Sequence, residues 1–132
     1  MNPGPERGPG VPREDALRDR LLDIAGPEPS TAERALMVRL IESFLRKVPL
    51  MLDLLEAELA AEDPDASRVA AHALRGSASN IGADGLALLA GALEDEIRAG
   101  RIPDASAISA LRAEATALRP VFESTAARLA DS

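Results

Sequence analysis

Apolar residues recur at three- and four-residue steps in five segments of this 132-residue chain, and Gly or Pro residues separate the segments. Such steps place the apolar side chains on one face of an α-helix. Ala, Leu, Glu and Arg, which are good helix formers, are abundant. Phe44 and Phe122 are the only aromatic residues, and Val and Ile are sparse, so strands have little to build on. The pattern predicts an all-α protein.

Helix start and stop signals divide the chain into five predicted helices. The first four span 14–25, about 32–61, 63 to about 80 and about 83–99, and the last follows Pro103-Asp104 and carries the apolar positions from Ile108 to Leu129. Ser30 or Thr31 is expected to cap the second helix, and Gly82 to close the third in a left-handed conformation. Pro49 is expected to kink or briefly break the second helix, and Pro120 to bend the last.

The predicted core consists of the apolar positions in helical register. They are Leu17, Leu21, Ile24, Ala25, Leu36, Leu40, Phe44, Val48, Leu52, Leu55, Leu59, Ala70, Leu74, Ser77, Ile81, Leu86, Leu89, Ala90, Leu93, Ile97, Ile108, Leu111, Ala115, Leu118, Phe122, Ala126 and Leu129. Short connections favour antiparallel neighbours, which predicts an up-and-down four-helix bundle with the first short helix as an accessory. Residues 1–13, rich in Pro and Gly, are predicted to be a disordered leader, and 14–132 a single domain.

Composition excludes several classes of function. The net charge of −7 and the lack of a Lys or Arg cluster argue against nucleic acid as a partner. The absence of Cys rules out disulfides and thiolate metal sites and suits a cytoplasmic protein. No stretch approaches the roughly 20 apolar residues of a membrane span. We therefore expect a cytoplasmic protein with no membrane partner.

The single histidine, His72, stands out because of its surroundings. On a helix, residues three, four and seven apart share a face, which groups His72 with Arg75, Gly76 and Ser79, opposite the apolar residues. A glycine inside a helix costs about 1 kcal/mol relative to Ala. Gly76 lies one turn beyond His72, where a missing side chain would let the backbone of another protein approach the imidazole. The pattern predicts a docking surface around His72.

A neutral imidazole nitrogen is a good nucleophile near neutral pH, and attack on an acyl phosphate would give a phosphohistidine. Arg75, and Arg98 from the next helix, could neutralise the added negative charge, and Ser79 could donate a further hydrogen bond. The chain has no Gly-rich phosphate loop and no Walker pattern. We therefore expect a phosphoryl carrier without kinase activity of its own.

Other chemistries find less support. One His without Cys cannot make a conventional zinc site, and no Glu-x-x-His pair suggests a di-iron bundle. A Ser-His-Asp triad lacks a nucleophile elbow. The acidic run Glu94, Asp95 and Glu96 is expected to be a solvated helix face.

Residues 71–100, AHALRGSASNIGADGLALLAGALEDEIRAG, closely resemble the signature of histidine phosphotransfer (HPt) domains. The matching elements are His72, Leu74, Arg75, Gly76, Ser77, Ile81, Gly82 and Ala83, followed by Leu93-Glu94, Arg98 and Gly100. The upstream stretch FLRKVPLMLDLLEAELAAED resembles the preceding helix of that family. The resemblance covers roughly residues 36–130.

The resemblance implies that His72 is exposed midway along the second helix of the bundle. It implies a phosphorelay partner, the aspartate of a response-regulator receiver domain, with a hybrid histidine kinase as a second candidate. The Mg²⁺ ion that supports transfer would belong to the receiver, so no cofactor is expected on this chain. Arg75 replaces the commoner Lys, and family members vary at the positions of Arg98 and Ser79. We expect a free-standing monomer.

Two alternatives stay open. A non-transferring module of the same fold could sequester a receiver or a kinase, although it would not need His72, Arg75 and Gly76 intact. A purely structural bundle, such as an oligomerisation adaptor, would show an exposed apolar stripe and would have no use for Gly76 beside an exposed histidine.

Overall fold

The computed structural model describes residues 12–131, which form helices and no strand. The helices are α1 (Arg13–Ala25), α2 (Thr31–Ala60), α3 (Pro64–Asn80), α4 (Asp84–Arg98) and α5 (Ala105–Ala130). The all-α prediction is confirmed. Arg13, assigned from the sequence to the leader, is the first residue of α1, and the predicted leader up to residue 11 lies outside the described residues.

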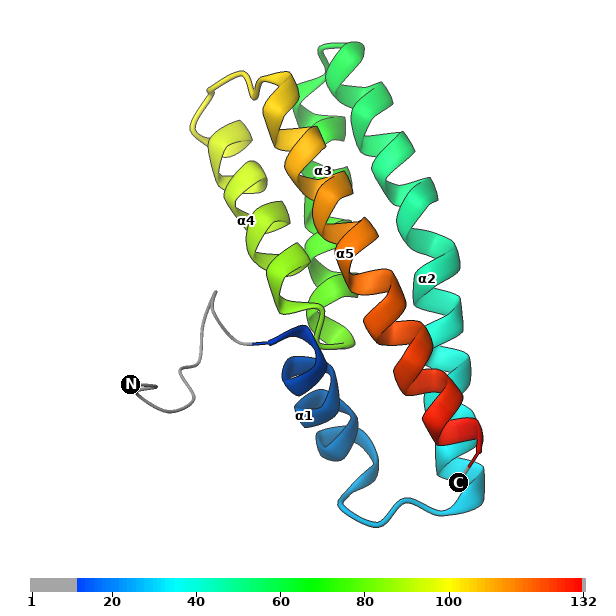
Figure 1. Ribbon diagram of the computed structural model, residues 1–132. Coiled ribbons are helices and arrows are strands. Elements are labelled where there is room, and N and C mark those ends of the chain that lie inside the picture. Colours follow the sequence, from blue (N-terminus) through cyan, green and yellow to red (C-terminus); the bar gives the residue numbers. More distant parts are fainter. Residues whose placement is uncertain (1–11, 132) are drawn as a thin grey trace, which may run out of the picture.

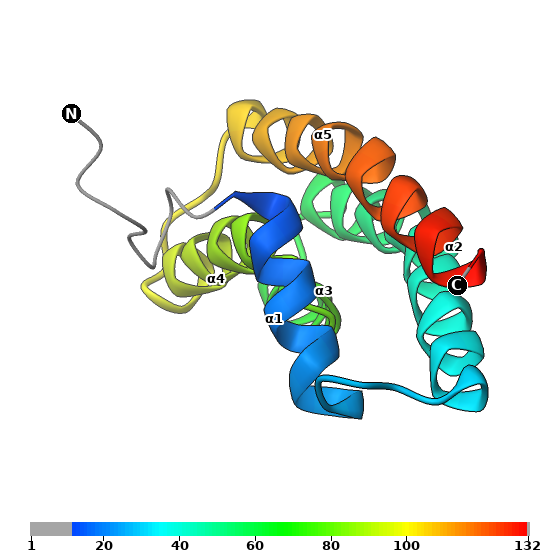
Figure 2. The same cartoon turned by 60° about the horizontal axis from the view of Figure 1, so that its bottom comes forward.

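Helices α2 to α5 form an up-and-down bundle (Figure 1). Around the bundle α2 packs against α3 and α5, and α4 packs against the other side of α3 and α5. Because α2 and α5 have 30 and 26 residues while α3 and α4 have 17 and 15, the longer pair extends past the shorter pair at one end. There α1 contacts α5 and α4, as an accessory to the bundle (Figure 2).

Caps define the helix ends. The Ser30 hydroxyl accepts a hydrogen bond from the Glu33 backbone N–H, and the Glu33 carboxylate accepts one from the Ser30 N–H, so Ser30 is the cap of α2. Asp63 caps α3 ahead of Pro64. Gly82 has a φ of +79°, which confirms the left-handed residue expected after α3.

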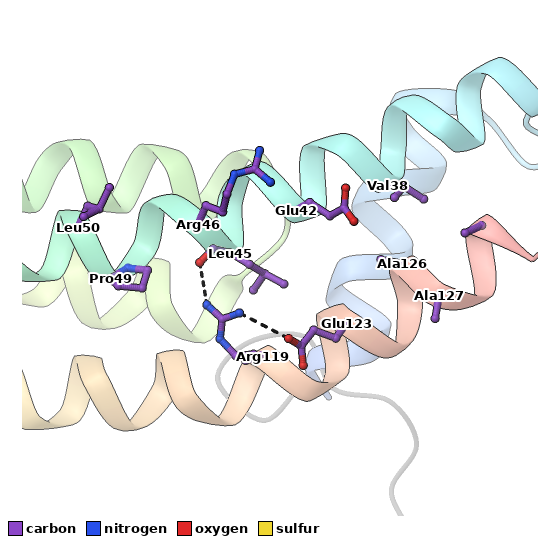
Figure 3. A pocket seen from close by; sticks show the side chains of 11 residues that line it. Val38, Glu42, Leu45, Arg46, Pro49, Leu50, Arg119, Glu123, Ala126 and Ala127 are labelled. Carbon is purple, nitrogen blue, oxygen red and sulfur yellow. Dashed lines mark hydrogen bonds and ion pairs between the residues drawn. The ribbon is translucent and has the colours of Figure 1, made fainter.

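Pro49 does not break α2. Proline has no N–H, so the carbonyl oxygen of Leu45, four residues earlier, loses its helical donor. The guanidinium of Arg119 on α5 donates a hydrogen bond to that oxygen over 2.7 Å (Figure 3). A donor from the neighbouring helix thus replaces the missing one, and α2 continues through Pro49 while bending about halfway along (Figure 2).

The core lies between the four bundle helices, and most of the predicted positions are buried or packed against it. Three of them are exposed instead, namely Ile24, Leu36 and Leu40. On α2 the chain buries Met37 and Ile41 in their place. Leu36 and Leu40 reach Phe44 in two four-residue steps, and Met37 and Ile41 reach it in a four- and a three-residue step. Both spacings are helical, so periodicity alone does not separate the two sets. The neighbouring helices decide which row of α2 faces inward.

Candidate functional site

His72 lies midway along α3, and its side chain is 65% exposed. Ala71 and Leu74 on either side of it are fully buried, which fixes the face that α3 turns to the core. The imidazole therefore points to solvent, as the sequence predicts.

The imidazole of His72 has a partner that the sequence did not assign. The Nδ1 atom of His72 lies 2.9 Å from Oε2 of Glu94 on α4. Arg75 donates to Oε1 of the same carboxylate over 3.3 Å, and Arg98 donates to Oε2 over 3.0 Å. We call His72, Arg75, Glu94 and Arg98 the Glu94 cluster.

The expectation that Glu94 lies on a solvated helix face is wrong, because this residue is only 1% exposed. Asp95 is exposed and Glu96 half-buried. Glu94 follows Ala90 by four residues and precedes Ile97 by three, which places it beside the buried stripe of α4. That register, together with the Leu93-Glu94 pair, was the signal in the sequence.

Opposing effects act on the Glu94 carboxyl. Burial by itself raises its pKa, but the hydrogen bonds from His72 and Arg75, together with the charges of His72 and Arg98, bring the pKa below its ordinary value. Glu94 is thus a carboxylate at neutral pH. A carboxylate accepts hydrogen bonds and has no proton to donate, so the Nδ1 atom of a neutral His72 must carry the proton. The Nε2 atom keeps its lone pair.

Gly91 on α4 makes room for Arg75. A Cβ atom at Gly91 would lie 3.2 Å from Nε of Arg75 and 3.4 Å from its Cδ and Cζ atoms. The arginine side chain therefore lies directly over the glycine backbone on its way to Glu94. A side chain at position 91 would push it away.

Gly76 serves no packing purpose among residues 12–131. It is exposed, and a Cβ atom added there would meet nothing within 4 Å. Close helix–helix packing, the ordinary reason for a glycine inside a helix, does not apply here.

The site residues predicted from the sequence are only partly brought together. Arg75 and Arg98 reach the carboxylate that holds His72. Ser79 is exposed seven residues after His72, about 10 Å further along the helix axis. It lines a groove between α3 and α4 with Arg75, Leu88 and Asp95, and lies outside the Glu94 cluster.

Residues 12–131 contain no group of three or more His, Cys, Asp or Glu side chains that could hold a metal ion. None of the helices in this part of the chain has the length and apolar character needed to cross a membrane.

Comparison of the sequence with models of protein families shows which family the chain belongs to. The family model described as Hpt domain matches residues 39–120. The chain belongs to the Hpt domain family. No curated protein and no solved structure gives a match to the chain. Hpt domains function in histidine phosphotransfer within phosphorelays and are phosphoryl carriers rather than kinases.

The Hpt match begins within α2 and ends within α5, so it contains α3, α4 and the whole Glu94 cluster. It leaves α1 outside. The exposed histidine, the buried glutamate and the open glycine therefore all belong to the Hpt part of the chain.

Proposed function

We propose that Nε2 of His72 accepts a phosphoryl group from the aspartyl phosphate of a receiver domain and passes it to the aspartate of another receiver. The observation that carries this proposal is the Glu94–His72 contact. It occupies Nδ1, so the lone pair of Nε2 is on the exposed side of a ring that is already oriented.

The transfer step needs no proton to enter or leave the ring. The Nε2 lone pair forms a bond to phosphorus while the bond between phosphorus and the aspartyl oxygen breaks, and the aspartate leaves as a carboxylate. Nδ1 keeps its proton, so positive charge develops on the imidazole. The Glu94 carboxylate, 2.9 Å from Nδ1, stabilises that charge. The reverse sequence returns the phosphoryl group to an aspartate.

Arg75 and Arg98 add positive charge beside the reacting ring. Their side chains are 51% and 56% exposed, while the carboxylate that they share is buried. We propose that these guanidinium groups stabilise the phosphoryl group through charge-assisted hydrogen bonds. Because Ser79 lies outside the cluster, we assign it at most to the docking surface.

The surface around His72 suits the approach of another protein. Val69, one turn before the histidine, is 57% exposed, Ala73 is exposed, and Gly76 leaves open space one turn after it. We propose that a receiver domain docks here and brings the Mg²⁺ ion for the transfer. A hybrid histidine kinase is a second candidate partner, through a receiver of its own.

The first experiment is transfer of labelled phosphoryl groups from a panel of phosphorylated receivers, with His72→Gln beside the wild type. We expect acid-labile, base-stable label on the wild type and none on the variant, which keeps an amide donor near Glu94 and should remain folded. A folded wild-type protein that binds a receiver but takes no label would instead indicate a sequestering module. If neither label nor binding appears with any receiver, the proposal fails.

A further inference from the structure

Helix α4 contributes both a flat surface and an acceptor to the side chain of Arg75. Gly91 and Glu94 lie three residues apart on α4 and share one face of that helix. Both are buried, whereas the Arg75 side chain is 51% exposed. The arginine lies across the backbone of Gly91, and its Nη1 atom comes within 3.3 Å of Oε1 of Glu94. The path of this side chain therefore depends on what occupies position 91.

A Cβ atom at position 91 would act on Arg75 alone among the groups around Glu94. Its three nearest neighbours would be Nε, Cδ and Cζ of Arg75, at 3.2 to 3.4 Å, so the guanidinium would have to move away by a few tenths of an ångström. The bond from Nη1 to Oε1 is already 3.3 Å long, and such a shift breaks it. His72 and Arg98 reach the other oxygen at 2.9 and 3.0 Å. An alanine at position 91 would thus detach Arg75 and keep the other two contacts.

The dependence on Gly91 is a property of arginine at position 75. The inner part of the planar guanidinium, Nε and Cζ, is what lies over the glycine. A lysine carries a single ammonium nitrogen on a flexible stem, which can turn away from a methyl group. Lysine would therefore tolerate alanine at position 91, whereas arginine in its observed position does not. Arg75 and Gly91 are a matched pair.

We propose that Gly91 is a positioning residue for phosphoryl transfer, because it allows Arg75 to lie against α4 and bind Glu94. That bond uses one of the five N–H groups of the guanidinium, which leaves others for the oxygens of a phosphoryl group. The guanidinium also covers Oε1, so it screens the buried carboxylate from the negative charge of an approaching phosphoryl group. The inference rests on the proposed phosphotransfer at His72, since that reaction brings the negative charge to this place.

Urea unfolding measures the link between positions 75 and 91 without any phosphoryl transfer. With Gly91 present, Arg75→Ala should lower the urea midpoint by roughly a few tenths of a molar, as expected for a half-exposed ion pair. In the Gly91→Ala background, Arg75→Ala should leave the midpoint unchanged, because the bond to Glu94 is already absent. Comparing one substitution in two backgrounds cancels the helix propensity of the new alanine at position 91. Equal shifts in the two backgrounds would overturn the proposal.

Transfer assays test what the pair does for the reaction. Gly91→Ala should slow phosphoryl transfer to His72 about tenfold, because the positive charge is kept but its position is lost. Circular dichroism should show an intact fold, since alanine is the better helix former. When Arg75→Lys is already present, adding Gly91→Ala should change the rate no further. A slowing of the same size in both backgrounds would assign the effect to the backbone of α4 and refute the matched pair.

Gly85 on the same helix provides a matched control. A Cβ atom there would lie 2.8 Å from Oε2 of Glu114, which pairs with Arg13 on α1. Gly85→Ala therefore also pushes a charged side chain aside, but one outside the Glu94 cluster, and it should transfer at the wild-type rate. Equal loss of transfer in the Gly85→Ala and Gly91→Ala variants would overturn the specific role of Gly91.

The two readouts separate this inference from the proposed function. If the wild type takes no label from any receiver while the unfolding shifts still depend on position 91, the phosphotransfer proposal fails and Gly91 has no reaction to serve. If label transfers normally and the unfolding shifts are equal in both backgrounds, the phosphotransfer proposal stands and the positioning role of Gly91 is refuted.

Discussion

The exposed imidazole of His72 on α3 is joined to the buried carboxylate of Glu94 on α4 by a contact of 2.9 Å between Nδ1 and Oε2. One side of the ring is held by a charge inside the protein, and the other side faces solvent. The contact connects two helices that pack together along the bundle. It gives the site both a fixed ring orientation and a defined free nitrogen, and several testable consequences follow from it.

Glu94→Gln should slow phosphoryl transfer to His72 at least about tenfold, because the amide cannot stabilise the charge that develops on the imidazole. It should also shift the imidazole tautomer. Since His72 is the only histidine, its two ring nitrogens give the only imidazole signals in a ¹⁵N NMR spectrum. We expect protonated Nδ1 in the neutral wild type and a tautomer mixture in the variant. An unchanged tautomer with normal transfer would remove Glu94 from the mechanism.

Acid should destabilise the fold partly through Glu94. Its pKa in the folded protein is lower than the ordinary value of 4.5. A carboxyl group of this kind stabilises the fold above its unfolded pKa, and that contribution is lost as the pH falls through the folded pKa. Urea unfolding across this range should show a smaller acid-induced loss for Glu94→Gln than for the wild type. Equal losses in both proteins would show that other carboxylates account for it.

Removal of Arg75 and Arg98 should be non-additive. Each is a half-exposed ion pair, so Arg75→Ala or Arg98→Ala alone should cost no more than about 1 kcal/mol of unfolding free energy. When both arginines are removed, the contact with His72 is the one that remains to the buried Glu94 carboxylate within the Glu94 cluster. The double variant should exceed the sum of the single effects by about 1 kcal/mol. A strictly additive result from denaturant unfolding would mean that the two arginines act independently of Glu94.

Substitutions at Gly76 should change the stability of the fold and the docking of a receiver in different ways. Because a Cβ atom there meets nothing, Gly76→Ala should stabilise α3 by about 1 kcal/mol. That gain should raise Tm by a few degrees. Gly76→Gln should also keep the fold but reduce phosphoryl transfer, since its bulk stands where a receiver would approach. Ala113→Gln on the exposed side of α5 is a matched control that should transfer normally. Full transfer by Gly76→Gln would place the docking surface elsewhere.

Several parts of the protein could be predicted from the sequence. Helix-forming composition, apolar periodicity and punctuation at Ser30, Asp63 and Gly82 are local signals, and they determined the helices to within a few residues. The exposure of His72 and the open face at Gly76 also follow from helical geometry within α3 alone.

Tertiary structure decided what local periodicity leaves undetermined. On α2, the set of positions that contains Leu36 and the set that contains Met37 are both spaced as on a helix face. Packing against the neighbouring helices buries Met37 and leaves Leu36 exposed. Leu45 lost its helical donor to Pro49, and only the position of Arg119 on α5 supplied another. Glu94 could be read as one more surface acid until α4 packed against α3, because burial and pairing depend on groups 22 residues apart in sequence. The sequence by itself determined the helices and the exposed histidine. The packing of α3 on α4 determined which nitrogen of that histidine is free.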